Sequence, residues 1–492
     1  PLPHYNTCSQ AKQPFHRRLR LRFSSYMPEV EEELKELNIG GKSYPPLGDG
    51  QYDAIVLGTG LTECMISGLL SVAGLKVLHA DRNDYYGASC ASVTLQQAFQ
   101  QLRGSNSIDA SKDYGNFRDY NIDLIPKFIM SGGNMVKLLV QCGVHKYLDF
   151  RLVEGSFVYS AGRPHKVPVT AKEALTSGMM GMFEKNRCRQ FFSFVNFYDP
   201  KDESTFAGLD LQKMTMSELF KYYGLQKDTI EFIGHSLALY RNDSYLDLPA
   251  IQPVMKIKLY AESLAKHGKS PYLYTLYGLG ELPQAFARLS AVHGGTFMLR
   301  TPFSEVLFDD SGKAIGIRAG DEVATSKFIV GDPTYFPEKT RLAAKVARCY
   351  CILNAPPPNS RESSSCQIIV PSAQVVPARN SDIYILVLSD SHKVAPPGKF
   401  VALVSTTVET DDPKAELQFG VDLLGPVLDS FYSVDDLYEP IGNGKDDNIY
   451  ISQSYDATTH FESTVDDVLD IYKRIFDKDL KFEEPSQAQS EE

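Results

Sequence analysis

A glycine-rich turn early in the chain constrains the fold more than any other feature. The apolar run at residues 53–57 leads into Gly58-Thr59-Gly60-Leu61-Thr62-Glu63, and a helical pattern follows over residues 61–72. A second apolar run, residues 76–80, ends at Asp81. A buried strand, a Gly-x-Gly turn, a helix, another strand and an acid in this order open a dinucleotide-binding domain. The sequence therefore predicts an α/β fold with a Rossmann-like, flavoprotein-like domain.

The last residue of this turn argues against a bound nucleotide. A dinucleotide site requires a third glycine and open amides for the pyrophosphate, and this chain has Glu63 there. Its charge would repel a pyrophosphate by roughly 1 kcal/mol in water and about 4 kcal/mol in a protein-like dielectric at ~4 Å. It would also be favourable at the positive end of the helix dipole. We predict a closed, vestigial dinucleotide turn with no cofactor, made of Gly58, Gly60, Glu63 and Asp81. In the alternative, Glu63 points to solvent beside a working flavin site.

Composition excludes several classes of protein. A chain of 492 residues exceeds the usual limit of one hydrophobic core, so two or more lobes are expected. The net charge of −11 argues against a nucleic-acid partner, and the apolar runs are too short to span a membrane. The eight cysteines are scattered without metal-site spacing, which is typical of reduced cytosolic thiols. Catalytic motifs are absent, and His79 and His235 are expected to be packed core residues.

The pattern along the chain predicts an insertion within the nucleotide fold. Residues 51–165 and 266–478 are assigned to a discontinuous Rossmann-like domain, and residues 166–265 to a helical domain. The aromatic stripe around Phe191 in that helical domain fits either core packing or an apolar ligand. Residues 1–50 are basic at first and are expected to be a disordered extension, a transit peptide or translated upstream sequence. Residues 479–492 are expected to be an acidic tail.

Local signals place further elements. Thr215-Met216-Ser217-Glu218 and Asp228-Thr229-Ile230-Glu231 have the capping-box pattern that opens a helix. Pro283 is expected to start a helix that reaches residue 292. Strands are expected at residues 297–299, 304–308, 314–318, 328–332 and 448–452, followed by an amphipathic helix over residues 464–476.

Several long motifs resemble the Rab GDP dissociation inhibitor family, which is related to the Rab escort proteins. The matching segments are residues 54–64, 81–87, 121–128, 269–274, 277–284, 332–337 and 454–462. The resemblance implies a flavoprotein-like fold without flavin. It also implies a monomeric, non-enzymatic GTPase regulator that binds GDP-bound geranylgeranylated Rab GTPases and slows GDP release. Such a protein extracts the Rab from membranes, so it is cytoplasmic and only transiently membrane-associated.

The resemblance also implies site residues. A Rab-binding platform maps to Tyr86, Glu281, Arg288, Thr296 and Met298, and a mobile loop maps to Arg241. A groove for the Rab C-terminus is expected at Phe128, Leu138, Leu139 and Tyr147. Because each buried CH₂ of a lipid anchor contributes ~0.8 kcal/mol, an extractor needs comparable apolar shelter. The wall of a prenyl pocket is expected at Met179, Met180, Met182, Phe183, Phe191, Phe192 and Val195.

The chain departs from the family pattern at four positions. Ala88 and Ala285 replace glycines, His293 replaces a tyrosine and Thr275 replaces a proline. If either family glycine has a positive φ, the alanine that replaces it in this chain would strain the turn. Ala285 is expected inside a helix, which alanine would instead favour. Three rival functions are considered. They are a Rab escort protein, which presents Rabs to the prenyltransferase, an FAD-dependent oxidase, which Glu63 argues against, and a binding module for some other prenylated GTPase.

Overall fold

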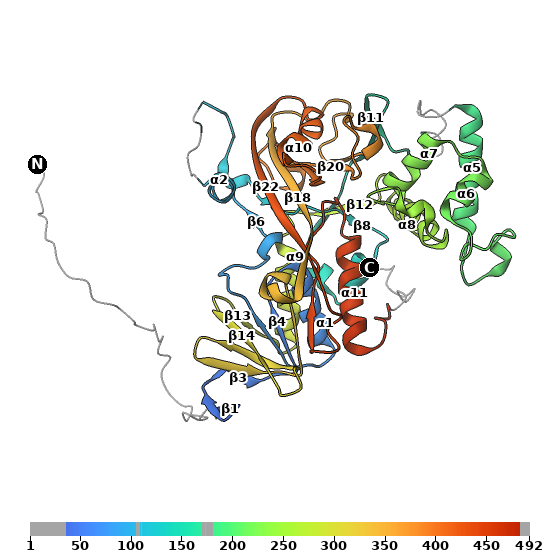
Figure 1. Ribbon diagram of the computed structural model, residues 1–492. Helices are drawn as coiled ribbons and strands as arrows, with labels where there is room; N and C mark the ends of the chain where they lie inside the picture. Colours follow the sequence, from blue (N-terminus) through green and yellow to red (C-terminus); the bar gives the residue numbers. More distant parts are fainter. Residues whose placement is uncertain (1–35, 105–108, 110, 170–172, 174–180, 483–492) are drawn as a thin grey trace, which may run out of the picture.

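The computed structural model describes residues 36–104, 109, 111–169, 173 and 181–482. Figure 1 shows two lobes, one above the other, and a helical domain beside the upper lobe. The chain passes between the lobes several times, so neither lobe is a continuous segment. This arrangement confirms the predicted α/β fold with an inserted helical domain.

The lower lobe is built on a five-stranded parallel sheet of order β13-β5-β4-β17-β23. One face is covered by helices α1, α9 and α11, and the other by the four-stranded sheet β14-β15-β16-β3. Alternate strand residues point to the two faces, so Val56 packs toward the helices and Ile55 toward the second sheet. The elements are β4 (Ala54–Leu57), α1 (Leu61–Val72), β5 (Val77–Ala80), α9 (Glu281–Val292), β13 (Thr296–Met298), β17 (Phe328–Gly331), β23 (Ile449–Ile451), α11 (Glu462–Phe476), β3 (Pro46–Gln51), β14 (Phe303–Phe308), β15 (Ala314–Ala319) and β16 (Glu322–Thr325).

The upper lobe contains a seven-stranded sheet of order β11-β10-β19-β20-β21-β18-β22. Helix α10 packs on one face and α2 on the other. Cys349 and Cys351 share a face of β18, with sulfur atoms 3.4 Å apart. None of the cysteines in the described part of the chain forms a disulfide. The elements are α2 (Leu95–Arg103), β10 (Gly155–Ser160), β11 (Arg163–Lys166), β18 (Thr340–Leu353), β19 (Cys366–Val370), β20 (Ile383–Ser389), β21 (Phe400–Thr407), α10 (Pro413–Asp422) and β22 (Val427–Pro440).

Small sheets and a helix complete the two lobes. These are β1 (Leu37–Ile39) with β2 (Lys42–Tyr44), β6 (Ser92–Val93) with β7 (Ile122–Asp123), the sheet of β8 (Ile129–Met130), β12 (Tyr272–Thr275) and β9 (Phe150–Leu152), and α3 (Asn134–Gln141). The fold therefore begins before residue 51, because β3 pairs with β16 and Leu47 is buried. It also continues past residue 479, because Leu480 and Phe482 pack against the core.

The helical domain comprises α5 (Met182–Phe197), α6 (Met216–Tyr223), α7 (Lys227–Glu231), the π-helix η5 (Phe232–Leu237) and α8 (Ile251–His267). The capping box at Thr215 is confirmed, since its side chain accepts from Glu218 N and Glu218 accepts from Thr215 N. The box predicted at Asp228 is wrong. Helix α7 begins one residue earlier, at Lys227, and has no side-chain cap, so Asp228 lies inside it.

Helix α1 has the predicted bounds, whereas α9 begins two residues earlier than expected. Glu281 is therefore the first residue of α9, and Pro283 lies within its first turn, where a missing N–H is tolerated. Ala285 is buried in this helix. Ala88, by contrast, has a φ of +45°. Of the two alanines, therefore, Ala88 has the predicted backbone strain and Ala285 does not.

Candidate functional site

The glycine-rich turn is closed by the side chain of Glu63. This side chain is buried and folds back over Gly60, where a methyl group would overlap Glu63 Oε2. Ser452 Oγ donates to Glu63 Oε1 at 2.5 Å. Burial, with the nearby carboxylate of Asp332, raises the pKa of Glu63 to about 8. Glu63 is therefore protonated at neutral pH. It neither points to solvent nor acts as the predicted anion, and it fills the turn by volume and hydrogen bonding.

The other groups that a dinucleotide would need are bonded to the protein itself. In the first turn of α1, Thr62 N donates to Tyr455 Oη at 3.2 Å. Asp81 accepts from Thr59 N at 2.7 Å and Thr59 Oγ1 at 2.6 Å. Its second oxygen accepts from Asn83 N at 2.8 Å and from Tyr335 Oη at 3.2 Å. These residues do not fit a flavin or a nicotinamide dinucleotide, because the ribose acceptor and a helix amide are both engaged.

Both predicted core histidines are buried, but only His79 is a simple packing residue. Burial lowers the pKa of His79 to about 4, so the neutral ring donates to Gly58 O. His235 instead lies between Asp382 of the upper lobe, at 2.6 Å, and Asp243, at 3.1 Å. Burial acts to lower its pKa, but the bonds to the two carboxylates raise it to about 10. His235 is therefore a charged bridge between the helical domain and the upper lobe.

The five platform residues surround β13, the edge strand of the lower sheet. On α9, Glu281 and Arg288 are seven residues apart and both exposed, so they share the outer face. The Tyr86 ring packs on Phe297 of β13, with centroids 6.1 Å apart. Thr296 and Met298 point to the opposite face of the strand from Phe297, and Met298 packs beside the second sheet. The structure thus brings Tyr86 and α9 to one side of β13, and Met298 to the other.

The predicted groove residues are mostly in the core. Phe128, Leu138 and Leu139 are buried, so this part of the prediction is corrected: they belong to the hydrophobic core. Only Tyr147, in the 3₁₀ turn η3 (Val144–Tyr147), is exposed. The guanidinium of Arg288 lies over its ring, 4.4 Å from the centroid. The contact thus joins one residue of the predicted platform to the one exposed residue of the predicted groove.

The predicted prenyl wall is divided between core and surface. Met179 and Met180 lie outside the described residues. On α5, Phe191 and Val195 are buried, and the Phe191 ring contacts Phe192, Phe220 and Tyr223. Met182 and Phe183 are 86% and 85% exposed at the start of the helix. Core packing thus accounts for the buried part of the aromatic stripe, and the two exposed side chains remain without a role in the core.

Arg241 joins the helical domain to a buried charge cluster that the sequence analysis did not single out. Arg241 Nη1 lies 3.6 Å from Asp456 Oδ2. Lys127 is fully buried and donates to Asp456 Oδ1 at 2.6 Å and to Thr458 O at 2.6 Å. Nearby Leu239 has a φ of +58°, which is unusual for a branched side chain. The signal that could have found this cluster is the single lysine within the apolar segment 122–129.

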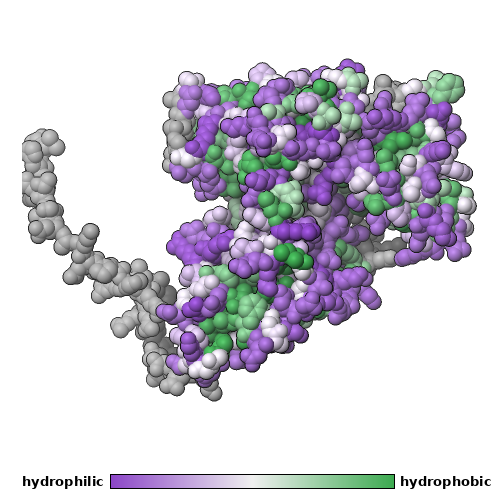
Figure 2. All heavy atoms as spheres, in the orientation of Figure 1, coloured by the Kyte–Doolittle hydropathy of each residue, from purple (hydrophilic) through white to green (hydrophobic). Residues whose placement is uncertain are grey.

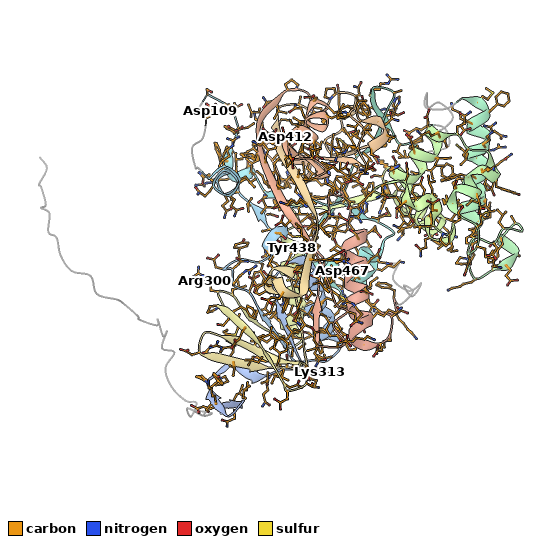
Figure 3. The ribbon with its side chains drawn as sticks, in the orientation of Figure 1. Asp109, Arg300, Lys313, Asp412, Tyr438 and Asp467 are labelled. Carbon is orange, nitrogen blue, oxygen red and sulfur yellow. The ribbon has the colours of Figure 1, made fainter. Side chains whose placement is uncertain are left out.

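A cavity of about 570 Å³ lies in front of the closed turn, between the two lobes. Arg82 and Tyr85 line it from the lower lobe, and residues 433–436 and Tyr438 of β22 from the upper lobe. Figure 3 labels Tyr438 where the lobes meet, and Figure 2 shows the notch between them. Across the described residues, His, Cys, Asp and Glu side chains form no group of three or more that could hold a metal ion, and no helix is long and apolar enough to cross a membrane.

Comparison with known proteins gives a consistent result. The family model for the GDP dissociation inhibitors matches residues 48–487. Guanosine nucleotide diphosphate dissociation inhibitor 2 of Arabidopsis thaliana is 54% identical, over 88% of this chain and 97% of its own length. Rab GDP dissociation inhibitor beta of Rattus norvegicus is 50% identical, over 88% and 97%.

Solved structures agree with these matches. The crystal structure of a Rab GDI from Plasmodium falciparum superposes with a TM-score of 0.83 at 42% identity, covering 88% of this chain and 99% of that one. An oxidoreductase from Methanosarcina mazei has a TM-score of 0.55 at 13% identity, covering 86% and 100%. This second likeness shows the fold alone, and it confirms the predicted flavoprotein-like architecture.

Proposed function

The chain belongs to the GDP dissociation inhibitor family, and from that premise we propose that it holds geranylgeranylated Rab GTPases in their GDP-bound state, slows GDP release and extracts them from membranes. It is a Rab GDP dissociation inhibitor and not an enzyme. The Rab partner follows from the family, whereas the lipid, the nucleotide state and the membrane step belong to the proposal.

The observation that carries the proposal is the surface at the edge of β13. Glu281 and Arg288 present two opposite charges on one face of α9, and Tyr86 adds an aromatic ring on the same side of the strand. Tyrosine and arginine are enriched where proteins bind one another. The closed turn at Glu63 supports a binding role for the fold, because no cofactor chemistry is available there.

The helical domain is proposed to shelter the lipid. A soluble carrier must offset ~0.8 kcal/mol for each CH₂ withdrawn from the bilayer. The rings of Phe191, Phe192 and Tyr223 form an apolar cluster between α5 and α6. Met182 and Phe183 are exposed at the start of α5, where they offer apolar surface to an isoprenoid, whereas Phe191 is itself packed in the core.

Release of a fluorescent GDP analogue from a geranylgeranylated Rab tests the proposal. We expect the chain to slow release from the lipidated Rab more than from an unprenylated one, and Arg288→Ala to weaken the effect. Arg341→Ala is the matched control, because Arg341 is an exposed arginine of β18 that pairs only with Glu439 among the described residues. Unchanged release together with tight binding to the prenyltransferase would instead support an escort protein.

A further inference from the structure

The cavity between the lobes is separate from the platform but adjoins it. None of the five platform residues lines the cavity. The loop that follows β5 lies between the two, because Tyr85 lines the cavity while the next residue, Tyr86, packs on β13. Arg300, just after β13, donates from its backbone to Asn83 O at 2.8 Å, which ties the loop to the edge strand. The two surfaces are thus continuous.

The floor of the cavity is not built for a phosphate or a sugar. Gly58 and Tyr455 lie at its base, and Tyr455 already accepts from the α1 amide. Leu124 and Ile125 add apolar area. A volume of about 570 Å³ falls within the roughly 300–1,000 Å³ that is usual for ligand sites. The floor therefore suits apolar side chains and backbone better than an anionic group.

The two rims differ in charge. On the lower rim, the Arg82 guanidinium is stacked over the Tyr335 ring at 4.4 Å and bonded to Thr334. The upper rim carries Asp435 and Asp436, whose side chains are 54% and 42% exposed. Asp435 is held in place by the buried Arg348 at 2.6 Å, and Asp436 accepts from Tyr438 Oη at 3.0 Å and lies 3.7 Å from Lys345 Nζ. These two cations offset part of the rim charge, but the cavity lining as a whole holds four aspartates, Asp81, Asp332, Asp435 and Asp436, against Arg82 and Arg348, so it favours a cationic group.

The upper rim is also the edge of a sheet. β22 is the last strand of the seven-stranded order, and β18 is its only strand partner among the described residues. Val434, which is 48% exposed, lies on this strand between Ser433 and Asp435. At Tyr438 both backbone groups are already bonded to Ser454, so the part of this edge that can offer backbone groups to an extended segment of a partner is at residues 433–436. Side-chain pockets then provide the specificity.

We infer that this cavity receives an extended, basic segment of the bound GTPase, in addition to the contacts on the platform. A lysine or arginine of that segment faces Asp435 and Asp436, and its apolar neighbours pack against Tyr85 and Val434. The inference rests on the proposed function, since it assigns a second contact surface to the same partner. Charge complementarity at such a rim mainly raises the association rate.

Binding of a GDP-loaded, geranylgeranylated Rab to three variants tests the inference. Asp436→Lys reverses the rim charge, Asp436→Asn removes it, and Tyr85→Ala removes an exposed ring that is 44% accessible. Asp411→Lys is the matched control, because it changes the net charge equally at an exposed residue outside the cavity lining. The next residue, Asp412, is labelled in Figure 3 in the upper lobe, away from Tyr438. Thermal melting confirms that each variant folds.

We expect Asp436→Lys and Tyr85→Ala each to raise Kd about tenfold, and Asp411→Lys to change it less than about twofold. Asp436→Asn should lower the association rate and reduce its dependence on salt. If the unaltered chain slows GDP release but all three variants bind as tightly as it does, the cavity inference is overturned while the proposed function stands. If the unaltered chain does not slow GDP release, the proposed function itself fails.

Discussion

The guanidinium of Arg288 lies 4.4 Å from the centre of the Tyr147 ring, and this contact joins α9 to η3. Arg288 belongs to the platform and Tyr147 to the groove that the sequence predicted separately. A change at Tyr147 therefore alters the surroundings of Arg288 without replacing any residue of the predicted platform. The pair therefore provides a way to test whether the two predicted surfaces act together.

Replacing Tyr147 should loosen Arg288 and weaken Rab binding. A cation–π contact at an exposed site contributes about 0.5–1 kcal/mol, so Tyr147→Ala should raise the Kd for a GDP-bound Rab by roughly two- to fivefold. Tyr147→Phe keeps the aromatic face and should bind nearly as well as the unaltered chain. Equal weakening by both substitutions would show that the hydroxyl, and not the ring, matters.

Replacing Ala88 and Ala285 by glycine should change the stability of the protein in opposite directions. Ala88→Gly should relieve a left-handed alanine and stabilise the protein by about 1 kcal/mol. Ala285→Gly, within α9, should destabilise it by a similar amount, because glycine is a poor helix former. Thermal melting of the two variants is the measurement. A lower melting temperature for Ala88→Gly would contradict the strain.

Glu63 should make stability fall as pH rises. Its folded pKa of about 8 exceeds the ordinary value of 4.5, so between these values the folded state holds a proton that the unfolded state has lost. The free energy of unfolding then falls by at most about 1.4 kcal/mol per pH unit, and it stops falling above pH 8. Glu63→Gln should keep the bond from Ser452 and flatten this dependence. The difference in melting temperature between the two proteins at pH 5, 6.5 and 8 isolates Glu63, and a constant difference would refute its buried, protonated state.

His235 should also make stability depend on pH, but over a higher pH range than Glu63. Its folded pKa of about 10 exceeds the ordinary 6.5, so its contribution is complete below pH 6.5 and is lost as pH rises toward 10. His235→Gln should remove this dependence and destabilise the protein by roughly 3 kcal/mol at pH 7, since Asp382 is left buried without its partner. Hydrogen exchange should then accelerate in α8 and η5. Unaltered exchange there would argue against a bridge between the domains.

The local part of the fold could be predicted from the sequence. The bounds of α1 and the capping box at Thr215 both depend on neighbours within a few residues. The closed turn was also predicted, but for another reason. A charge argument cannot foresee that Ser452, nearly four hundred residues away, and burial together keep Glu63 protonated.

Tertiary packing determines the features of the fold and the candidate site that local sequence patterns do not predict. Phe128, Leu138 and Leu139 are apolar residues that suit a groove or a core equally, and only long-range contacts place them inside. The bonds from His235 to Asp382 and from Lys127 to Asp456 join residues far apart in the chain, so no local pattern reveals them. Whether the platform residues bind a Rab remains a prediction from resemblance.

Hydrogen exchange with and without a GDP-loaded, geranylgeranylated Rab tests the central claim most directly. The account predicts slower exchange in α9 and β13 on binding, with α10 on the upper lobe unchanged as an internal control. The same Rab loaded with a GTP analogue should give much weaker protection. Protection confined to the upper lobe, with α9 and β13 exchanging as in the free protein, would contradict the proposed platform.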